Sequence, residues 1–379
     1  MKIALVHDYL NQEGGAERVA RVLCQTYPDS PLYTSLYDPQ SMDSFWRNVD
    51  VRTSFMQMLR PSLPVAKTLL PLYPLAFESF DFSAYDMVLS SSSTFAKGVI
   101  TGPNTYHICY CHSPARYAWM YHDYVSQMKL GRAGRALLPA VVGPLRVWDY
   151  AAAQRPDAFI ANSRNTARRI AKFYRREAAV LHPPIAVNAY QPSTRTEPYF
   201  MVLARLLPYK RIDIAVEAFN RLRWPLLIVG DGPDATRLRG LAGPTVRFAG
   251  RVSDGEVRHH LRHCQALIWP GNEDLGLAPL EALASGRPVI SFRAGGAVET
   301  LVDGVTGRFF DEQTPEALVA VLRDFDPDSY DPAVLHAHVS EFDVFVFQQR
   351  LRQFVETSFQ RHTDRAGERA SSSAPSIPH

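Results

Sequence analysis

Cysteine is scarce in this sequence, with four residues among 379. So few cysteines give no disulfide framework in a chain of this length, and their spacing matches no zinc motif. They are Cys24, Cys109, Cys111 and Cys264. Cys109 and Cys111 stand next to His112, but they alternate with other residues as strand neighbours do. We therefore expect reduced thiols and no metal site here.

Long apolar runs are also missing from the sequence. No stretch approaches the roughly 20 apolar residues that a membrane-spanning helix needs. The apolar run Ile3–Val6 is ended by His7 and Asp8, which indicates a buried strand and not a signal peptide. We therefore expect a cytoplasmic protein whose only membrane contact would be peripheral.

Charge of one sign is in small excess, with 41 Lys and Arg against 38 Asp and Glu, a net charge of +3. This excess is too weak to indicate a nucleic-acid partner. It is also uneven, with roughly 20 basic against about 14 acidic residues in 1–185. A basic first half fits an anionic lipid surface or a phosphorylated acceptor, and it equally fits ordinary solvated surface charge.

Short apolar runs alternate with longer helical segments along the chain, a pattern typical of parallel sheets built from βαβ units. The length exceeds what one hydrophobic core usually organises, so we expect two domains. The expected strands are 2–7, 86–89, 106–111, 158–161, 199–204, 225–230, 245–249, 265–269 and 288–292. The expected helices are 16–25, 211–222, 235–241, 254–263 and 277–285.

A proline-containing polar stretch at 182–198 lacks apolar periodicity and is expected to link the two halves. Near the end, 342–354 carries Phe and Leu at helical spacing, whereas 361–379 is rich in Ser, Pro, Ala and charge. We therefore predict domains at 1–185 and 186–340, a C-terminal helix at 341–358 and a disordered tail at 359–379.

Paired glycines follow the first expected strand. Gly14 and Gly15 open a helix, where backbone N–H groups can approach an anion. The segment is neither a Walker loop nor a Gly-x-Gly-x-x-Gly turn. Taken alone, the pair favours an ordinary tight turn over an anion site.

Two cations and a second glycine pair follow strands of the second half. Arg205 and Lys210 lie in a strand-to-helix connection, where both could converge on a phosphate or could simply be solvated. Gly230 and Gly232 flank Asp231 after the next strand. A dinucleotide-binding turn is excluded there, because the third glycine is missing and Pro233 interrupts the turn.

Two carboxylates eight positions apart give the strongest signal. Glu273 lies in a loop after a strand, and Glu281 lies in an apolar helix that Gly286 ends. At helical spacing they would be on the order of 12 Å apart, which is too far for the acid/base pair of a glycosidase. That separation suits a hexose and the ribose of a nucleotide sugar. Because an unpaired buried carboxylate is costly, ribose hydroxyls are a fitting partner for Glu281.

Gly295 and Gly296 follow the strand expected at 288–292 and stand at a helix start. They offer further backbone donors to phosphate or sugar oxygens. Ligands of open α/β sheets bind at the carboxyl ends of the strands. The residues that follow the strands of both halves are therefore expected to line one shared site.

Taken together, these motifs make the chain resemble the retaining glycosyltransferases of family 4, which have the GT-B fold. The segments that carry the resemblance are Gly14-Gly15-Ala16-Glu17, Arg205 with Lys210, Gly230-Asp231-Gly232, and Glu273 to Glu281 in an E-x7-E pattern. The likeness covers about residues 1–355. One departure is Leu275, where the family usually has Phe, and there we expect a packing change only.

The resemblance implies an α/β fold of two Rossmann-like parallel-sheet domains facing a central cleft, with the C-terminal helix returning to the first domain. It implies that Arg205 and Lys210 hold the diphosphate of the donor, and that Glu273 binds the transferred sugar. His112 would lie near the reacting face of the sugar, unless it is a structural histidine at a strand end. The remaining donor-binding positions implied are Gly14, Gly15, Gly230, Gly232, Gly276, Leu277, Glu281, Gly295 and Gly296.

Within the family the chain looks most like bacterial mannosyltransferases of O-antigen and exopolysaccharide assembly, whose donor is typically GDP-mannose. The segments that carry this closer likeness are 110–117, 162–164, 182–184 and 207–213. The resemblance implies retention of the anomeric configuration by a same-face mechanism, with double displacement through Glu273 as an alternative. It implies no cofactor and no essential metal.

The acceptor side is less defined by the sequence. Lys129, Arg132, Arg135 and Arg146 stand among apolar residues in a stretch without acids, a composition that can lie in a membrane interface. These residues could dock the protein on the inner membrane, where it would reach a glycan or lipid-linked acceptor, or they could be solvated cations. A UDP-sugar-dependent transferase, a nucleotide-sugar epimerase and a sugar-nucleotide-binding scaffold remain as alternatives.

Overall fold

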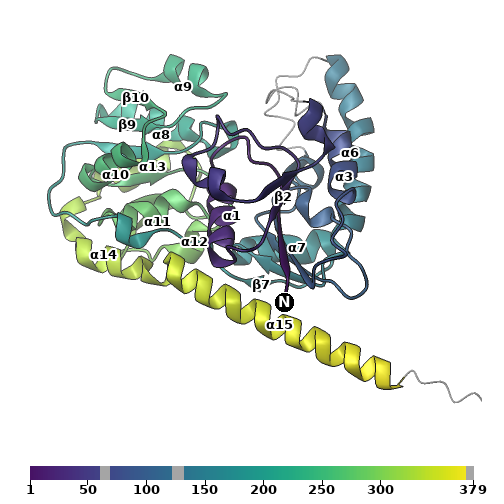
Figure 1. Ribbon diagram of the computed structural model, residues 1–379. Helices are drawn as coiled ribbons and strands as arrows, with labels where there is room; N and C mark the ends of the chain where they lie inside the picture. Colours follow the sequence, from purple (N-terminus) through teal and green to yellow (C-terminus); the bar gives the residue numbers. More distant parts are fainter. Residues whose placement is uncertain (60–68, 122–131, 373–379) are drawn as a thin grey trace, which may run out of the picture. The chain divides into compact units, whose positions relative to one another are not determined.

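The computed structural model describes residues 1–59, 69–121 and 132–372. The chain divides into two compact units, and each is described by itself. Unit 1 comprises residues 1–162, residues 166–181 and the chain from Phe347 onward. Unit 2 comprises residues 163–165 and 182–346. Figure 1 colours the chain along its sequence and labels its helices and strands.

Unit 1 is built on a parallel sheet in the order β3-β2-β1-β4-β5-β6-β7. Its strands are β1 (Ile3–His7), β2 (Leu32–Thr34), β3 (Val51–Thr53), β4 (Met87–Ser92), β5 (Tyr106–Cys111), β6 (Ala158–Ala161) and β7 (Ala179–Val180). Every residue of β1 and β4 is buried. Such strands, covered on both faces, are typical of parallel sheets with helices on either side.

The helices of unit 1 follow the same alternating order. They are α1 (Gly15–Thr26), α3 (Tyr73–Glu78), α4 (Arg116–Trp119), α6 (Arg132–Ala152), α7 (Arg164–Tyr174) and α15 (Val344–Ser372), of which α7 and α15 begin in unit 2. Helices α3 and α6 lie side by side (Figure 1), joined by a hydrogen bond from the indole of Trp148 to Glu78. The strands β2, β3 and β7 were not predicted, because runs of two or three residues give no readable alternation.

Unit 2 contains a second parallel sheet, in the order β10-β9-β8-β11-β12-β13. Its strands are β8 (Phe200–Leu203), β9 (Leu226–Val229), β10 (Val246–Gly250), β11 (Leu267–Trp269), β12 (Val289–Phe292) and β13 (Gly307–Phe310). Its helices are α8 (Ile212–Leu222), α9 (Ala235–Leu241), α10 (Asp254–His263), α11 (Leu277–Ala284), α12 (Ala297–Thr300), α13 (Pro315–Arg323) and α14 (Pro332–His338).

The strand order of unit 2 is that of a doubly wound Rossmann sheet. The chain starts at β8, moves outward to β9 and β10, and then resumes on the other side of β8 with β11. Unit 1 follows the same plan, with β1 and β4 at the reversal. The prediction of two Rossmann-like parallel α/β units is confirmed. Connections on either side of such a reversal run to opposite faces of the sheet, which opens a crevice at the carboxyl ends of the two central strands.

Helix α15 differs from its predicted extent. It begins at Val344 and continues to Ser372, well past residue 358, so the disorder predicted from 359 onward is wrong for 359–372. From Phe347 the helix belongs to unit 1. There the ring of Phe347 packs on Tyr110 of β5, and the guanidinium of Arg352 donates a hydrogen bond to the carbonyl of Thr26. Phe347, Leu351 and Val355 repeat every four residues and are buried, so this stripe ties the helix to the unit.

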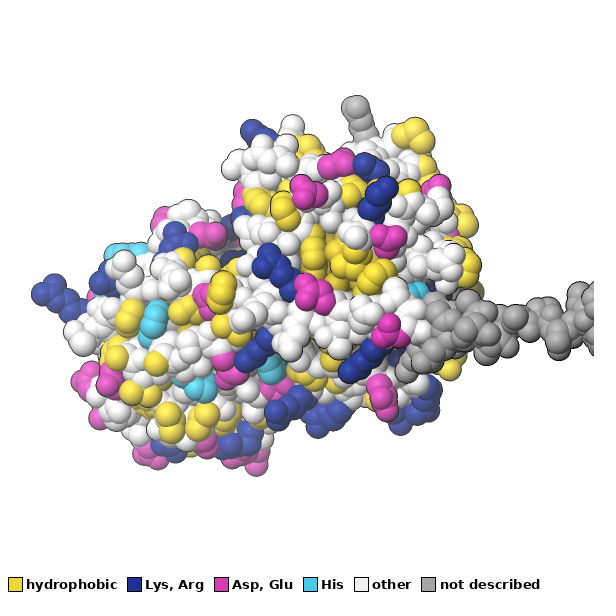
Figure 2. Space-filling view, turned by 60° about the horizontal axis from the view of Figure 1, so that its bottom comes forward, with side chains coloured by type: hydrophobic (Ala, Val, Ile, Leu, Met, Phe, Trp, Pro, Cys, Tyr) yellow, Lys and Arg dark blue, Asp and Glu magenta, His cyan; other side chains and the backbone are white. Residues whose placement is uncertain are grey.

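Within the described residues, no helix combines the length and apolar character needed to cross a bilayer. The face of the molecule in Figure 2 carries basic, acidic and hydrophobic side chains interspersed with one another. Scattered apolar side chains of this kind are normal on protein surfaces and need no partner to explain them.

Candidate functional site

Strands β8 and β11 are neighbours in the sheet of unit 2, and the loops that follow them leave the sheet at the same edge. Lys210 comes from the first loop and Glu273 from the second, and the structure places the ammonium 3.0 Å from the carboxylate. Both side chains are largely buried, with 13% and 12% of their surface exposed. The ammonium also lies over the ring of Trp269, 5.1 Å from its centre. A charge pair therefore stands at the position where this type of fold binds ligands.

Backbone contacts fix the loop that presents Lys210 and the exposed Arg205. Gly230 adopts a φ of +128°, and a Cβ there would lie 1.9 Å from the carbonyl oxygen of Ala204. A Cβ on Gly232 would lie 2.4 Å from the carbonyl oxygen of Leu206. These two glycines, for which the sequence predicted donor contacts, let the loops after β8 and β9 pack backbone against backbone.

The loop with Glu273 is held in a similar way by the glycines after β12. The amide of Gly296 donates a 2.9 Å hydrogen bond to the carbonyl of Glu273. A Cβ on Gly295, whose φ is +63°, would lie 2.1 Å from that same carbonyl oxygen. A Cβ on Gly296 would lie 2.2 Å from the Cα of Leu275. These glycines, for which the sequence predicted donor contacts, hold the backbone of the loop that carries Glu273.

We predict that Gly296→Ala destabilises the chain by about 1–3 kcal/mol, the usual cost of overpacking. Its φ of −74° suits alanine, so the cost comes from the clash with Leu275 and not from backbone conformation. Gly240→Ala is the control, because a Cβ at that helical position meets nothing within 4 Å and alanine favours the helix. Urea unfolding of both variants measures the difference, and equal stabilities would contradict the prediction.

Helix α11 begins directly after the Glu273 loop. Gly276 precedes it with a φ of +88°, and a Cβ there would meet the indole of Trp269 at 2.7 Å. No side chain caps this helix start, so the first N–H groups, beginning at Leu277, can serve an anion. Glu281 lies within the helix and is 3% exposed, as the apolar pattern around it predicted.

In unit 1 the corresponding position is the pair β1 and β4. The hydroxyl of Ser91 lies 3.1 Å from Nδ1 of His7 and 2.8 Å from Nε2 of His112, so it links the two rings. Nε2 of His7 lies 3.9 Å from the carboxylate of Glu17 and has no hydrogen-bond partner in the described structure. The predicted His112 is thus half-buried at the end of a polar chain that begins at Glu17.

Gly14 and Gly15 start α1 beside this chain. Gly14 is the N-cap residue and no side chain caps the helix. A Cβ on Gly14 would lie 2.8 Å from the carboxylate of Glu17, so glycine leaves room for Glu17 to turn toward the helix start. This is a geometric reason for glycine that the sequence did not show.

Asp8 was not predicted as a site residue. Its carboxylate is buried and accepts backbone N–H groups from Ser93, Thr94, Phe95 and Ala96 at 2.6–3.0 Å. One side chain therefore fixes the loop after β4. The sequence signal was a charged residue directly after a fully buried strand, since a buried carboxylate needs several donors.

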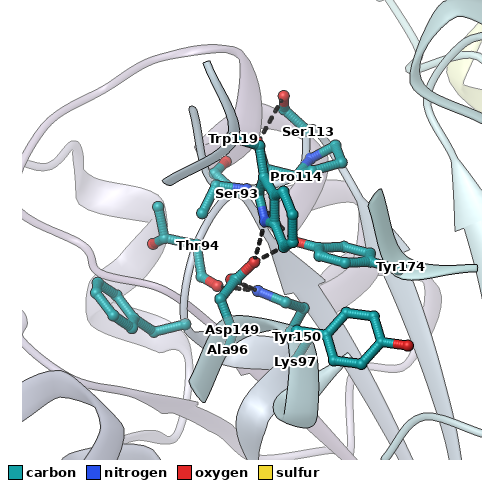
Figure 3. Close-up of polar contacts among 12 residues, drawn as sticks. Ser93, Thr94, Ala96, Lys97, Ser113, Pro114, Trp119, Asp149, Tyr150 and Tyr174 are labelled. Atoms are coloured by element: carbon teal, nitrogen blue, oxygen red, sulfur yellow. Dashed lines mark hydrogen bonds and ion pairs between the residues drawn. The ribbon is translucent and has the colours of Figure 1, made fainter. Parts of the chain in front are cut away.

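A second buried charge group lies behind that loop (Figure 3). Lys97 and Asp149 are 1% and 0% exposed and their charged atoms lie 2.5 Å apart. Asp149 also accepts hydrogen bonds from the indole of Trp119 and the hydroxyl of Tyr174, at 2.7 and 2.8 Å. Lys97 also donates to the carbonyl of Thr94. The group connects the loop after β4 with α4, α6 and α7.

Burial lowers the pKa of two histidines of unit 1 to about 3. For His107 the added cause is the charge of Arg155, and for His112 it is the charge of His7. The ordinary value is near 6.5, so the unfolded chain binds these protons first as the pH falls. Both rings are therefore neutral in the folded protein at neutral pH.

We predict that the free energy of unfolding decreases as the pH falls from about 6.5 toward 3. In that window each of these histidines adds up to about 1.4 kcal/mol per pH unit to the loss of unfolding free energy. Above the window the histidines are neutral in both the folded and the unfolded chain, so this loss is absent. His107→Gln keeps a hydrogen-bond donor for Ser90 and should reduce the slope by about 1 kcal/mol per pH unit. Denaturant unfolding between pH 7 and 4.5 measures this, and an unchanged slope would contradict it.

Glu299 is a further residue that sequence reasoning missed. In unit 2 its carboxylate accepts the backbone N–H groups of Arg164 and Asn165 at 2.7 and 2.8 Å and lies 3.2 Å from Nε2 of His182. Burial acts against its charge, but these hydrogen bonds keep the pKa of Glu299 below its usual range. Glu299 thus binds the first turn of α7 as an acidic N-terminal partner.

The predicted basic surface is only partly described. Lys129 lies outside the described residues, and Arg132 and Arg135 lie on α6 in a stretch whose side chains are not described. Arg146, further along α6, donates a 2.7 Å hydrogen bond to the carbonyl of Ala118. Arg146 therefore connects α6 to α4, which is a structural role.

Residues 189–332 match the family model for glycosyl transferases group 1, and this segment lies within unit 2. One relative is a GDP-mannose-dependent alpha-(1-6)-phosphatidylinositol monomannoside mannosyltransferase of Mycolicibacterium smegmatis, 30% identical over 44% of this chain and 52% of that protein. Another is a D-inositol 3-phosphate glycosyltransferase of Streptomyces avermitilis, 28% identical over 50% of this chain and 47% of that protein. The chain thus spans about half the length of these relatives.

Solved structures share the architecture over nearly the whole chain. Sucrose-phosphate synthase from Thermosynechococcus elongatus superposes with a TM-score of 0.75 at 16% identity, covering 95% of this chain and all of that one. Anabaena HepE in complex with UDP-glucose gives a TM-score of 0.66 at 17% identity, covering 94% of this chain and all of that one. The chain therefore has the GT-B fold, and its residues 189–332 match the group 1 glycosyl transferases.

Proposed function

We propose that the chain is a retaining glycosyltransferase of family 4 that transfers mannose from GDP-mannose to a glycan or lipid-linked sugar acceptor. The observation that carries the proposal is the pair of Lys210 and Glu273 at the carboxyl ends of β8 and β11. Such a pair offers a cation for a leaving diphosphate and a carboxylate for sugar hydroxyls within one small site. The match of residues 189–332 to the glycosyl transferases group 1 supports it.

Loss of the diphosphate is the step for which the site is suited. As the bond from the sugar to the phosphate breaks, negative charge grows on the phosphate oxygens, and fixed donors stabilise that charge. The ammonium of Lys210 would move from Glu273 to the phosphate, and the planar guanidinium of Arg205 would donate further hydrogen bonds to it. The uncapped start of α11 would add backbone N–H groups. Glu273 would then bind hydroxyls of the sugar.

The buried Glu281 is proposed to bind the ribose, and the glycines at 295 and 296 to complete the donor pocket. In unit 1 we assign His112 to a sugar hydroxyl, since its neutral ring can donate or accept a hydrogen bond. The departing phosphate oxygen would take the proton of the acceptor hydroxyl, so this same-face reaction needs neither a protein base nor a metal or cofactor.

The choice of GDP-mannose rests on the name of a relative. The Mycolicibacterium protein is described as GDP-mannose-dependent, whereas HepE was solved with UDP-glucose, so a UDP-sugar is the competing donor. A role in surface polysaccharide assembly in the cytoplasm, with contact to the inner membrane through the basic segment around α6, is part of the same proposal.

The test is a panel of GDP- and UDP-sugars in thermal shift, followed by NMR of the preferred donor with and without a lipid-linked acceptor mimic. GDP-mannose should raise the melting temperature most, and the product should keep the α configuration. Preference for a UDP-sugar would keep the class and reject the mannosyl assignment. Stabilisation by none of them would reject the proposed function.

A further inference from the structure

Three potential metal ligands lie together on unit 2, away from the Lys210–Glu273 pair. They are Glu197, His259 and His263, whose ligand atoms all lie within 4.8 Å of one another. Glu197 precedes β8, and the two histidines lie on α10, which leads into β11. Both connections enter the sheet at the amino ends of its strands. The group therefore lies at the opposite edge of the sheet from the candidate donor site.

The two histidines are spaced as a chelating pair. Residues four apart lie on the same face of a helix, and the ring centres of His259 and His263 are 4.5 Å apart. Nδ1 of His263 lies 2.8 Å from the carbonyl oxygen of His259, so it carries the proton that it donates there. In the neutral ring this leaves the lone pair of Nε2 for a metal. A backbone carbonyl behind a ligating imidazole is the usual support of such a ligand.

Glu197 is fixed to the same end of the helix. Its backbone N–H donates a 2.7 Å hydrogen bond to the carbonyl of His263, and Pro198 restricts its backbone to extended conformations. Two residues further on, the hydroxyl of Tyr199 donates a 2.9 Å hydrogen bond to the carbonyl of His260. The carboxylate is thus held beside the histidine pair by contacts that do not involve the carboxylate itself.

The separation of the ligand atoms is close to what a metal needs. Bonds of about 2.0–2.1 Å to a tetrahedral ion put its ligand atoms roughly 3.3 Å apart. Glu197 and His259 are exposed and His263 is half-buried, so small side-chain rotations can close the remaining distance and a metal can enter from solvent. Two imidazoles and one carboxylate form a ligand set that zinc-like ions prefer, with a water in the fourth position.

We propose that Glu197, His259 and His263 bind a divalent transition-metal ion of the zinc class. The bound ion would connect α10 to the segment that enters β8, two parts of unit 2 far apart in sequence. It would stabilise the unit by binding the folded state alone. The site takes no part in the proposed transfer reaction.

The experiment is a titration of Zn²⁺ into tag-free, chelator-treated full-length chain, monitored by calorimetry. A parallel titration with Co²⁺ is monitored by visible absorption. We expect a single equivalent to bind, a tetrahedral Co²⁺ spectrum, and a higher melting temperature with Zn²⁺. His259→Asn and His263→Asn should each weaken Zn²⁺ binding at least tenfold. Glu197→Gln should also weaken Zn²⁺ binding, but less than the two histidine variants do. Transfer activity should be unchanged in all three variants.

His260→Asn is the matched control, since it removes a neighbouring histidine of the same helix that is not in the group. It should bind Zn²⁺ as the unmodified chain does, and circular dichroism verifies that each variant is folded. The proposal is overturned if the unmodified chain binds no Zn²⁺, or if His260→Asn loses affinity as the other histidine variants do. Because the readout is metal binding, it does not depend on the proposed function.

Discussion

Lys210→Met is expected to lower the turnover rate of sugar transfer by about 10²–10³-fold, the usual cost of removing one fixed donor from a developing oxyanion. Methionine keeps much of the volume of lysine, so the main change is the loss of the charge that lies beside Glu273 and over the ring of Trp269. The Michaelis constant for the donor should change less than the turnover rate, because the phosphate charge is greatest in the transition state. Steady-state kinetics with the preferred donor measures both quantities.

Arg221→Met is the control for this substitution. Arg221 is an exposed cation of the same unit, and its partner Glu316 is also exposed, so its loss should leave the rate unchanged. Lys210→Met leaves the carboxylate of Glu273 without its cation, and the variant could lose stability for that reason. The double variant Lys210→Met with Glu273→Gln removes both charges, and it should be folded and still inactive. Turnover near that of the unmodified chain in either variant would refute the role of Lys210.

Lys97→Met is expected to destabilise the chain by about 3–5 kcal/mol, because it leaves a buried carboxylate without its cation. Asp149 is fully buried, and the indole and hydroxyl that remain are neutral donors. Burial alone would lower the pKa of Lys97, but Asp149 raises it above its ordinary value, so the lysine is charged in the folded protein. Urea unfolding at neutral pH measures the loss.

The matched comparison is Arg221→Met, whose ion pair with Glu316 is exposed and should be worth less than about 1 kcal/mol. Adding Asp149→Asn to Lys97→Met should recover part of the lost stability, since the unpaired charge is then gone. A loss for Lys97→Met no larger than for the exposed pair would show that the buried charges are not coupled.

The two-unit plan was readable from the sequence because buried parallel strands form short, continuous apolar runs. The strands at β8, β9, β11 and β12 stand out in this way, and helices α9 and α10 were predicted at their observed bounds. β13 was missed, although Phe309 and Phe310 are buried, because Arg308 interrupts the apolar run. The end of α15 was misplaced because Ser- and Ala-containing polar sequence can be disordered or helical, and composition does not decide between them.

The candidate site was predictable one residue at a time, but its contacts were not. Spacing put Lys210 and Glu273 after two different strands, and only the strand order makes these strands neighbours. Asp8 and Glu299 act on backbone N–H groups far away in sequence, which no local pattern encodes. The glycines at 230 and 296 were interpreted as donor contacts, but each is also required by an approach of two backbone segments that becomes visible only in three dimensions.

The hydrogen bonds from the loop after β4 to the carboxylate of Asp8 limit where phosphate can bind in unit 1. Successive backbone N–H groups that point inward form a nest, a concavity that attracts anions. In the loop from Ser93 to Ala96 the chain supplies that anion itself, with both carboxylate oxygens in use. This nest is therefore closed to ligands. We therefore expect an incoming phosphate to bind at the start of α11 after Gly276, which no side chain caps.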